Sequence, residues 1–188
     1  MGLPAFTQSG VLPPYVGSDP TQPGGRSPYS ASLTQLVTRL GTSPQRRGIL
    51  RGDLDHRAGL IAAALVGFQW LDGSFAEDIE ATQGRPPNDI DVVTFFARPS
   101  NLTHQNEWSA FVQANSSLLL PSNAKAHFKT DPYFVDIGFG PTYVIEQTAY
   151  WLSLFSHQRT TGIWKGMIQV GLDAQQDDAN ARQLLGNI

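Results

Sequence analysis

Two aspartates one residue apart, Asp89 and Asp91, lie in the otherwise apolar run 89–96 and carry the clearest chemical signal of this sequence. If the run is a strand, both carboxylates point to one face, because side chains alternate between the two faces of a strand. Neighbouring carboxylates repel each other unless a cation lies between them. Carboxylate oxygens suit Mg²⁺, which usually also contacts substrate phosphates. The spacing therefore predicts a site for Mg²⁺ or Mn²⁺.

A second signal is the pair Gly73 and Ser74, which follows another apolar run. Glycine lets backbone amides approach a phosphate closely, and a helix that opens after it would direct free N–H groups at that phosphate. The Ser74 hydroxyl would add a donor, although such a pair is also a common turn or helix N-cap. Together with the aspartates, the pair indicates phosphoryl or nucleotidyl transfer.

This combination resembles the nucleotidyltransferase superfamily related to DNA polymerase β, over about residues 45–140. The matching motifs are Leu71-Asp72-Gly73-Ser74-Phe75 and Asp89-Ile90-Asp91-Val92, with a loop insertion at 84–87 between them. Four stretches, at 10–14, 72–75, 87–92 and 164–167, further resemble DUF6932, a family of small bacterial nucleotidyltransferase-like proteins. The resemblance implies a polymerase β-like fold and leaves the substrate open.

The superfamily uses a third carboxylate on a neighbouring strand, and this sequence offers Asp131 and Asp136. The two are five residues apart and must point to opposite faces of one strand, so at most one can join the site. Apolar neighbours favour Asp136, which makes Asp89, Asp91 and Asp136 the predicted metal ligands. Asp131 remains the alternative.

Basic and aromatic residues could complete a nucleotide site. Lys129 and Lys165 are the candidates for neutralising a triphosphate, with Arg159 behind them. Trp164 could offer a ring for stacking a base. A core role for Trp164 and a solvated role for Lys165 are the alternatives.

The implied activity is Mg²⁺-dependent transfer of a nucleoside monophosphate from an NTP such as ATP to a hydroxyl of a protein, an RNA end or a small molecule. The resemblance also implies a role in a toxin–antitoxin or phage-defence system, with a partner protein encoded by a neighbouring gene. A non-catalytic module that senses a nucleotide or neutralises a partner is the main alternative. A metal-dependent nuclease is a weaker one.

The composition and the motifs that are absent exclude several other classes of function. A net charge of −3 over 188 residues gives no general basic surface for nucleic acid. The absence of cysteine excludes disulfides, thiolate metal sites and cysteine nucleophiles. P-loop, Rossmann and nucleophile-elbow motifs are absent as well. Without a signal peptide or an apolar span of roughly 20 residues, we expect a cytoplasmic protein that does not enter the membrane.

The elements that must position these residues form an α/β (α+β) pattern, a small mixed sheet covered by helices. Apolar periodicity and turn signals predict helices at 30–40, 43–64, 75–81, 103–117 and 142–155, and a short one ending near 185. Strands are predicted at 65–71, 89–96 and 163–172, with strand material in 125–139 broken by Pro132. Residues 1–44, rich in proline and glycine, are predicted to be an arm with a short helix, either a flexible leader or a segment lying across the nucleotidyltransferase-like domain 45–188.

Overall fold

The computed structural model describes residues 2–22, 24–102, 104–173 and 175–187. Its centre is a five-stranded mixed sheet in the order β1-β5-β2-β3-β4. The strands are β1 (Tyr29–Ser30), β2 (Val66–Asp72), β3 (Ile90–Ala97), β4 (Thr130–Asp136) and β5 (Ile168–Gly171). The β2 strand pairs antiparallel with β3 and β5, whereas β4 runs parallel to β3 and β1 parallel to β5. The predicted α/β class is confirmed.

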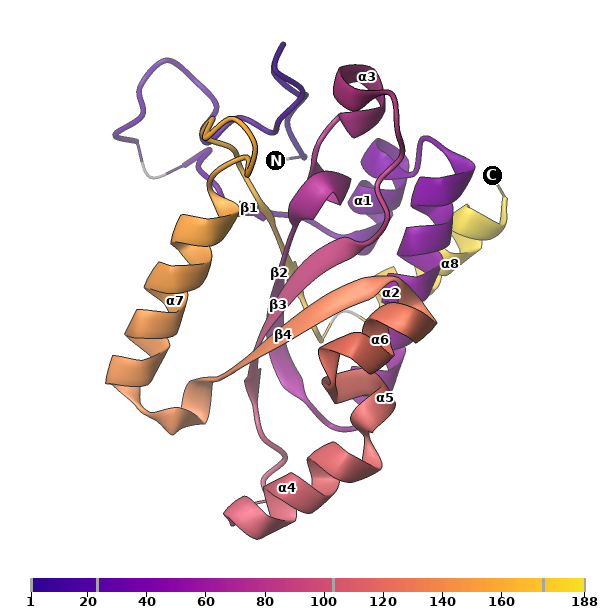
Figure 1. Ribbon diagram of the computed structural model, residues 1–188, viewed down its shortest axis with the longest axis vertical. Coiled ribbons are helices and arrows are strands. Elements are labelled where there is room, and N and C mark those ends of the chain that lie inside the picture. Colours follow the sequence, from indigo (N-terminus) through magenta and orange to yellow (C-terminus); the bar gives the residue numbers. More distant parts are fainter. Residues whose placement is uncertain (1, 23, 103, 174, 188) are drawn as a thin grey trace.

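Helices cover both faces of this sheet (Figure 1). One face carries α7, and the opposite face carries most of the remaining helices. The helices are α1 (Leu33–Leu40), α2 (Pro44–Ala62), α3 (Ile79–Gln83), α4 (Gln105–Ala114), α5 (Ser116–Leu119), α6 (Pro121–Phe128), α7 (Pro141–Phe155) and α8 (Gln175–Gly186), with 3₁₀ turns η1 (Gly73–Ala76) and η2 (Ile137–Phe139). Within the described ranges, no helix combines the length and the apolar composition that crossing a membrane requires.

The helix that begins at Pro44 has clear local causes. Ser43 caps it by accepting a hydrogen bond from the Arg46 amide, and Pro44 occupies the first turn, where a missing N–H costs nothing. Its inner side buries Ile49, Leu50 and Leu54 against the sheet.

One buried ion pair fastens this helix to the C-terminal one. Arg57 of α2 forms a two-pronged contact with Asp178 of α8 and also donates to Gln69 of β2 and to the Gly171 carbonyl. A buried guanidinium is tolerated only when its donors are satisfied in this way. Arg57 therefore joins two helices and two strands in a single contact network.

The strand β4 is continuous, so the predicted break at Pro132 is wrong. Pro132 lies opposite Val92 within the paired part of the strand. Among the strands that the structure describes, β4 lies at one edge of the sheet. Proline is accommodated in such an edge strand, because a residue without an N–H group need not supply a hydrogen bond on the open side.

The N-terminal residues contribute to the same core. Val11 and Leu12 are buried, and the Leu12 carbonyl accepts a hydrogen bond from the Gly166 amide at 2.7 Å. Tyr29 and Ser30 add the short strand β1 to the sheet beside β5. The N-terminal segment thus packs beside β5 and against the residues that follow η1, where Val11 forms an isolated bridge with Glu77.

Candidate acidic site

Three aspartates form a row across three neighbouring strands. Asp72 of β2 lies opposite Asp91 of β3, and Asp91 lies beside Asp131 of β4. Asp89 immediately precedes β3 and is two residues from Asp91, so its side chain shares that face. Four carboxylates from distant parts of the chain therefore gather at one end of the sheet.

An internal cation lies between two of these carboxylates. The Nζ atom of Lys125, from α6, is 2.6 Å from an Asp89 oxygen and 2.8 Å from an Asp131 oxygen. Hydrogen bonds from Lys125 to both carboxylates raise the pKa of its ammonium group above the ordinary value. The side chain remains about half exposed. Lys125 thus provides the positive charge that such a cluster needs in the absence of another cation.

The other two carboxyl groups are strongly affected by burial. Burial raises the pKa of Asp91, and the charges of Asp89 and Asp131 raise it further. Burial raises the pKa of Asp72 to about 7, against the opposing effect of Lys165. Within the described part of the chain, the Oδ1 atom of Asp72 is buried without a hydrogen-bond partner. A buried oxygen of this kind is costly unless a proton or a cation satisfies it.

Lys165 belongs to the wall of the site. Its buried Nζ lies 3.1 Å from Asp72 and 2.8 Å from Glu77. Burial acts to lower the pKa of Lys165, but the two carboxylates outweigh it and raise that pKa. Gln158 donates to the second Glu77 oxygen at 2.8 Å, which completes the cluster. The predicted triphosphate ligand Lys165 is therefore in the site but already paired.

The glycine of the Gly73-Ser74 pair is needed for two reasons. Gly73 has φ +76°, a conformation that favours glycine. A Cβ atom at this position would lie 2.4 Å from the nearer Asp91 oxygen. The short 3₁₀ turn that begins here therefore brings its backbone directly against the carboxylate row, with Ser74 at the rim of the same cleft.

The cleft in front of the carboxylates has a volume of about 910 Å³. Its acidic floor is formed by the four aspartates, and Arg159 lies at its edge, where its charge acts on Asp91. Tyr133 of β4 and Tyr150 of α7 line another part of the same cleft. The cleft thus combines an acidic floor with an aromatic wall.

These residues suit a divalent cation. Among the described residues, no group of three or more histidine, aspartate or glutamate side chains has the arrangement of a metal site. The ammonium group of Lys125 lies between the carboxylates of Asp89 and Asp131. Hard oxygen donors, an unpartnered Asp72 oxygen and the close approach of Gly73 are features that fit Mg²⁺ or Mn²⁺.

The structure brings Asp131 to the pair Asp89 and Asp91, and it does not bring Asp136 there. This corrects the expectation that favoured Asp136. Five residues along a strand correspond to about 16 Å and to the opposite face of the sheet. Asp136 instead accepts a hydrogen bond from Arg98 at 2.5 Å and one from the Gly138 amide at 2.9 Å.

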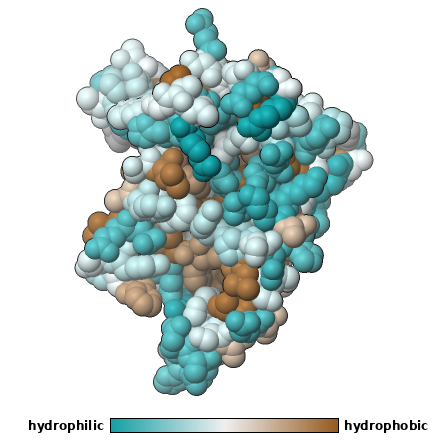
Figure 2. Space-filling model, in the orientation of Figure 1, coloured by the Kyte–Doolittle hydropathy of each residue, from teal (hydrophilic) through white to brown (hydrophobic). Residues whose placement is uncertain are grey.

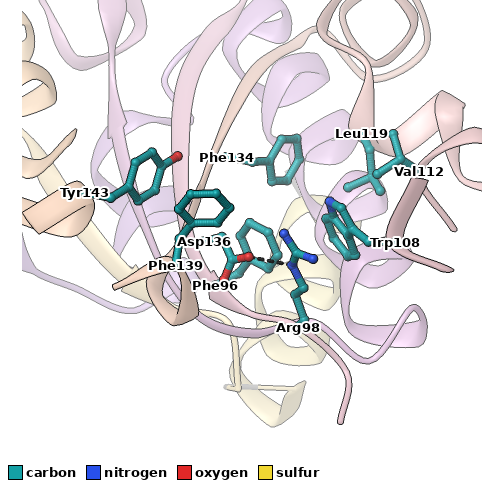
Figure 3. Close-up of a pocket in the computed structure, with 9 residues that line it drawn as sticks. All are labelled: Phe96, Arg98, Trp108, Val112, Leu119, Phe134, Asp136, Phe139 and Tyr143. Carbon is teal, nitrogen blue, oxygen red and sulfur yellow. Dashed lines mark hydrogen bonds and ion pairs between the residues drawn. The ribbon is translucent and has the colours of Figure 1, made fainter. Parts of the chain in front are cut away.

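The surroundings of Asp136 form a separate aromatic pocket of about 270 Å³ (Figure 3). Trp108 and Leu119 line one side, and Phe139 and Tyr143 line the other. On the surface, hydrophobic side chains gather just above the hydrophilic ones that cover α4 (Figure 2). This pocket holds its own ion pair and lies away from the acidic cleft.

Two further expectations are corrected. Lys129 does not line the cleft, and its Nζ lies beside Gly48 of α2. Lys129 ends α6 in a left-handed conformation, which turns the chain into β4 and directs the side chain away. Trp164 is exposed, packs edge-on against His157 and is not part of the cleft wall.

Four functional candidates were not predicted from the sequence: Asp72, Lys125, Tyr133 and Tyr150. Asp72 offered one signal, because it directly precedes Gly73 at the end of an apolar run. Lys125 offered none, since its helix and its partners are defined only by tertiary packing.

Comparison with known proteins gives a family and no function. Neither the curated proteins nor the solved structures contain a match to this chain. Residues 4–171 match the Family of unknown function (DUF6932). The match includes the aspartate row, Gly73, Lys125 and Lys165, and ends before α8. Because it spans most of the sequence, the chain belongs to the family DUF6932.

Proposed function

We propose that this protein binds a divalent metal ion with a nucleoside triphosphate in the acidic cleft and transfers the nucleotidyl group to a hydroxyl acceptor. The observation that carries the proposal is the convergence of Asp72, Asp89, Asp91 and Asp131 from three strands beside Gly73. Four neighbouring carboxylates, two of them strongly buried, repel one another and gain from a bound cation, which supports the proposal.

Each carboxylate has a distinct position for this task. Asp89, Asp91 and Asp131 would hold Mg²⁺ or Mn²⁺, and Asp72 lies opposite Asp91 on β2, with one oxygen that has no hydrogen-bond partner among the described residues. When bound, the ion would supply positive charge to the phosphates and activate an attacking hydroxyl. Gly73 and Ser74 line the same cleft, so a phosphate bound to the ion could meet this turn.

Lys125 and Arg159 are the two basic side chains that could neutralise the phosphates of a bound nucleotide. Lys125 must leave Asp89 and Asp131 when an ion binds, and its half-exposed side chain has room to turn toward the cleft. There it could meet the phosphates together with Arg159, which lines the same cleft. The buried Lys165 would instead keep Asp72 and Glu77 in place.

Calorimetry with Mn²⁺ and with Mg²⁺–ATP would test the binding step, and transfer of label from α-labelled NTPs to protein, RNA and small hydroxyl acceptors would test the chemistry. We expect Asp91→Asn to abolish both. The matched control is Asp136→Asn, which removes the competing aspartate at the far end of β4 and should leave both intact. Equal losses in the two variants, or no metal binding by the natural protein, would refute the proposal.

Nucleotide sensing without transfer is a second candidate, and one observation favours it. Lys125 already neutralises Asp89 and Asp131, so the site is stable without an ion and could alternate between two occupied states. Metal-dependent binding of ATP without label transfer to any acceptor would support this function. Transfer of label that is lost in Asp91→Asn would exclude it.

A further inference from the structure

We infer that the wall formed by Tyr133 and Tyr150 is a stacking surface for a nucleobase, so that the cleft selects nucleotides over inorganic polyphosphates. This inference rests on the proposed function and specifies its substrate class. Both rings line the acidic cleft, and they are 37% and 57% exposed. Large aromatic side chains exposed inside a concave polar site are a feature of ligand pockets.

The two rings are held in place from behind. The buried indole of Trp151 packs against both, with its ring centroid 4.6 Å from that of Tyr133 and 5.0 Å from that of Tyr150. Trp151 in turn packs edge-on against Phe155 in the core of the α7 side. A rigid platform of this kind loses little conformational freedom when a ligand stacks on it.

The platform also lies at the correct place relative to the carboxylates. Tyr133 is two residues after Asp131 on β4, so both side chains project from the same face of the sheet. A triphosphate held at the row would therefore leave its nucleoside within reach of these rings.

The other aromatic features do not meet these conditions. The pocket around Asp136 is about 16 Å away along β4, and the Arg98 guanidinium already covers the Trp108 ring at 4.6 Å. Trp164 is exposed but lies outside the cleft wall. Trp151 and Phe155 also line the acidic cleft but are buried, so Tyr133 and Tyr150 are the rings that a ligand in this cleft could reach.

The test compares two ligands that differ in the nucleoside. Affinities of the natural protein and of Tyr150→Ala would be measured by calorimetry with Mg²⁺–ATP and with Mg²⁺–tripolyphosphate. Loss of one stacked base weakens binding roughly 5- to 150-fold. We expect a loss in this range for ATP, an unchanged affinity for tripolyphosphate, and recovery of most ATP affinity in Tyr150→Phe.

Two further variants make the test specific. Tyr133→Ala should act like Tyr150→Ala, whereas Trp164→Ala, which removes an exposed ring outside the cleft, should leave both affinities unchanged. If tripolyphosphate binds the natural protein as tightly as ATP does, or if Tyr150→Ala weakens both equally, the stacking surface is refuted and the metal–phosphate site stands. If the natural protein binds neither ligand, the inference and the proposed function are refuted together.

Discussion

The buried carboxyl group of Asp72 should make the stability of this protein depend on pH. The residue is only 3% exposed, and burial raises its pKa from the ordinary 3.8 to about 7. In the unfolded chain the group ionises near its ordinary value. Between these two values the folded state holds a proton that the unfolded state has released, so stability decreases as the pH rises. Replacing Asp72 with asparagine removes this titration.

The size of the effect follows from the two pKa values. At 1.36 kcal/mol per pH unit, the rise from 3.8 to about 7 corresponds to about 4 kcal/mol of stability, lost by the time the pH exceeds 7. Roughly 2–3 kcal/mol of this loss falls between pH 5 and pH 8. The charge contact with Lys165 is already part of this shift, because Lys165 lowers the pKa of Asp72 against the effect of burial. The pH dependence of the difference between the natural protein and the variant therefore follows from the two pKa values alone.

The test is urea denaturation in the presence of EDTA at pH 5, 6, 7 and 8. It measures the difference in unfolding free energy between the natural protein and Asp72→Asn at each pH. We expect this difference to move by about 2–3 kcal/mol in favour of the variant, with most of the change complete by pH 7. Asp55→Asn, which removes an exposed carboxylate, should change stability little at any of these pH values. A difference between the natural protein and Asp72→Asn that stays constant from pH 5 to pH 8 would refute the reasoning.

Three other substitutions test other parts of the structure. Lys125→Met should tighten Mn²⁺ binding several-fold in calorimetry, because the ammonium group that competes with the ion for Asp89 and Asp131 is gone. The control Lys129→Met should leave the Mn²⁺ affinity unchanged. An unchanged Mn²⁺ affinity in Lys125→Met would contradict this role of Lys125. Gly73→Ala should lower the unfolding free energy, measured by urea denaturation, by about 1–2 kcal/mol, because the φ of +76° at this position is strained for alanine. An unfolding free energy equal to that of the natural protein would argue against a strained turn. Asp178→Ala should cost about 3–5 kcal/mol in the same measurement, because it leaves the buried Arg57 charge without its carboxylate, and a loss below 1 kcal/mol would disprove the importance of that pair.

The elements with strong local signals were predictable from the sequence. The strand predicted at 89–96 is β3, and the helix predicted at 43–64 is α2, because a long apolar run and a capped amphipathic segment are both encoded locally. The helix α6 was missed, since it buries only Ala124 and so has no apolar stripe to reveal it. The strand predicted at 163–172 is shorter, and β5 begins only at Ile168.

The candidate site was predictable only in part. Asp89, Asp91 and Gly73 could be found from spacing, because they lie close together in sequence and belong to neighbouring strands. The choice between Asp131 and Asp136 depends on the register of β4 against β3, which is determined by where α6 ends and β4 begins. A register between strands separated by several helices is a tertiary property, and no local pattern carries it.

The register of β4 also has a consequence for the order in which the site is assembled. The β2 and β3 strands are adjacent antiparallel strands in sequence, so Asp72 and Asp91 can meet early, whereas Asp131 must wait for the crossover through α4, α5 and α6. Lys125 lies in the helix that directly precedes β4. We therefore expect the third strand of the row to arrive together with its own neutralising charge, because Lys125 and Asp131 are six residues apart and form an ion pair.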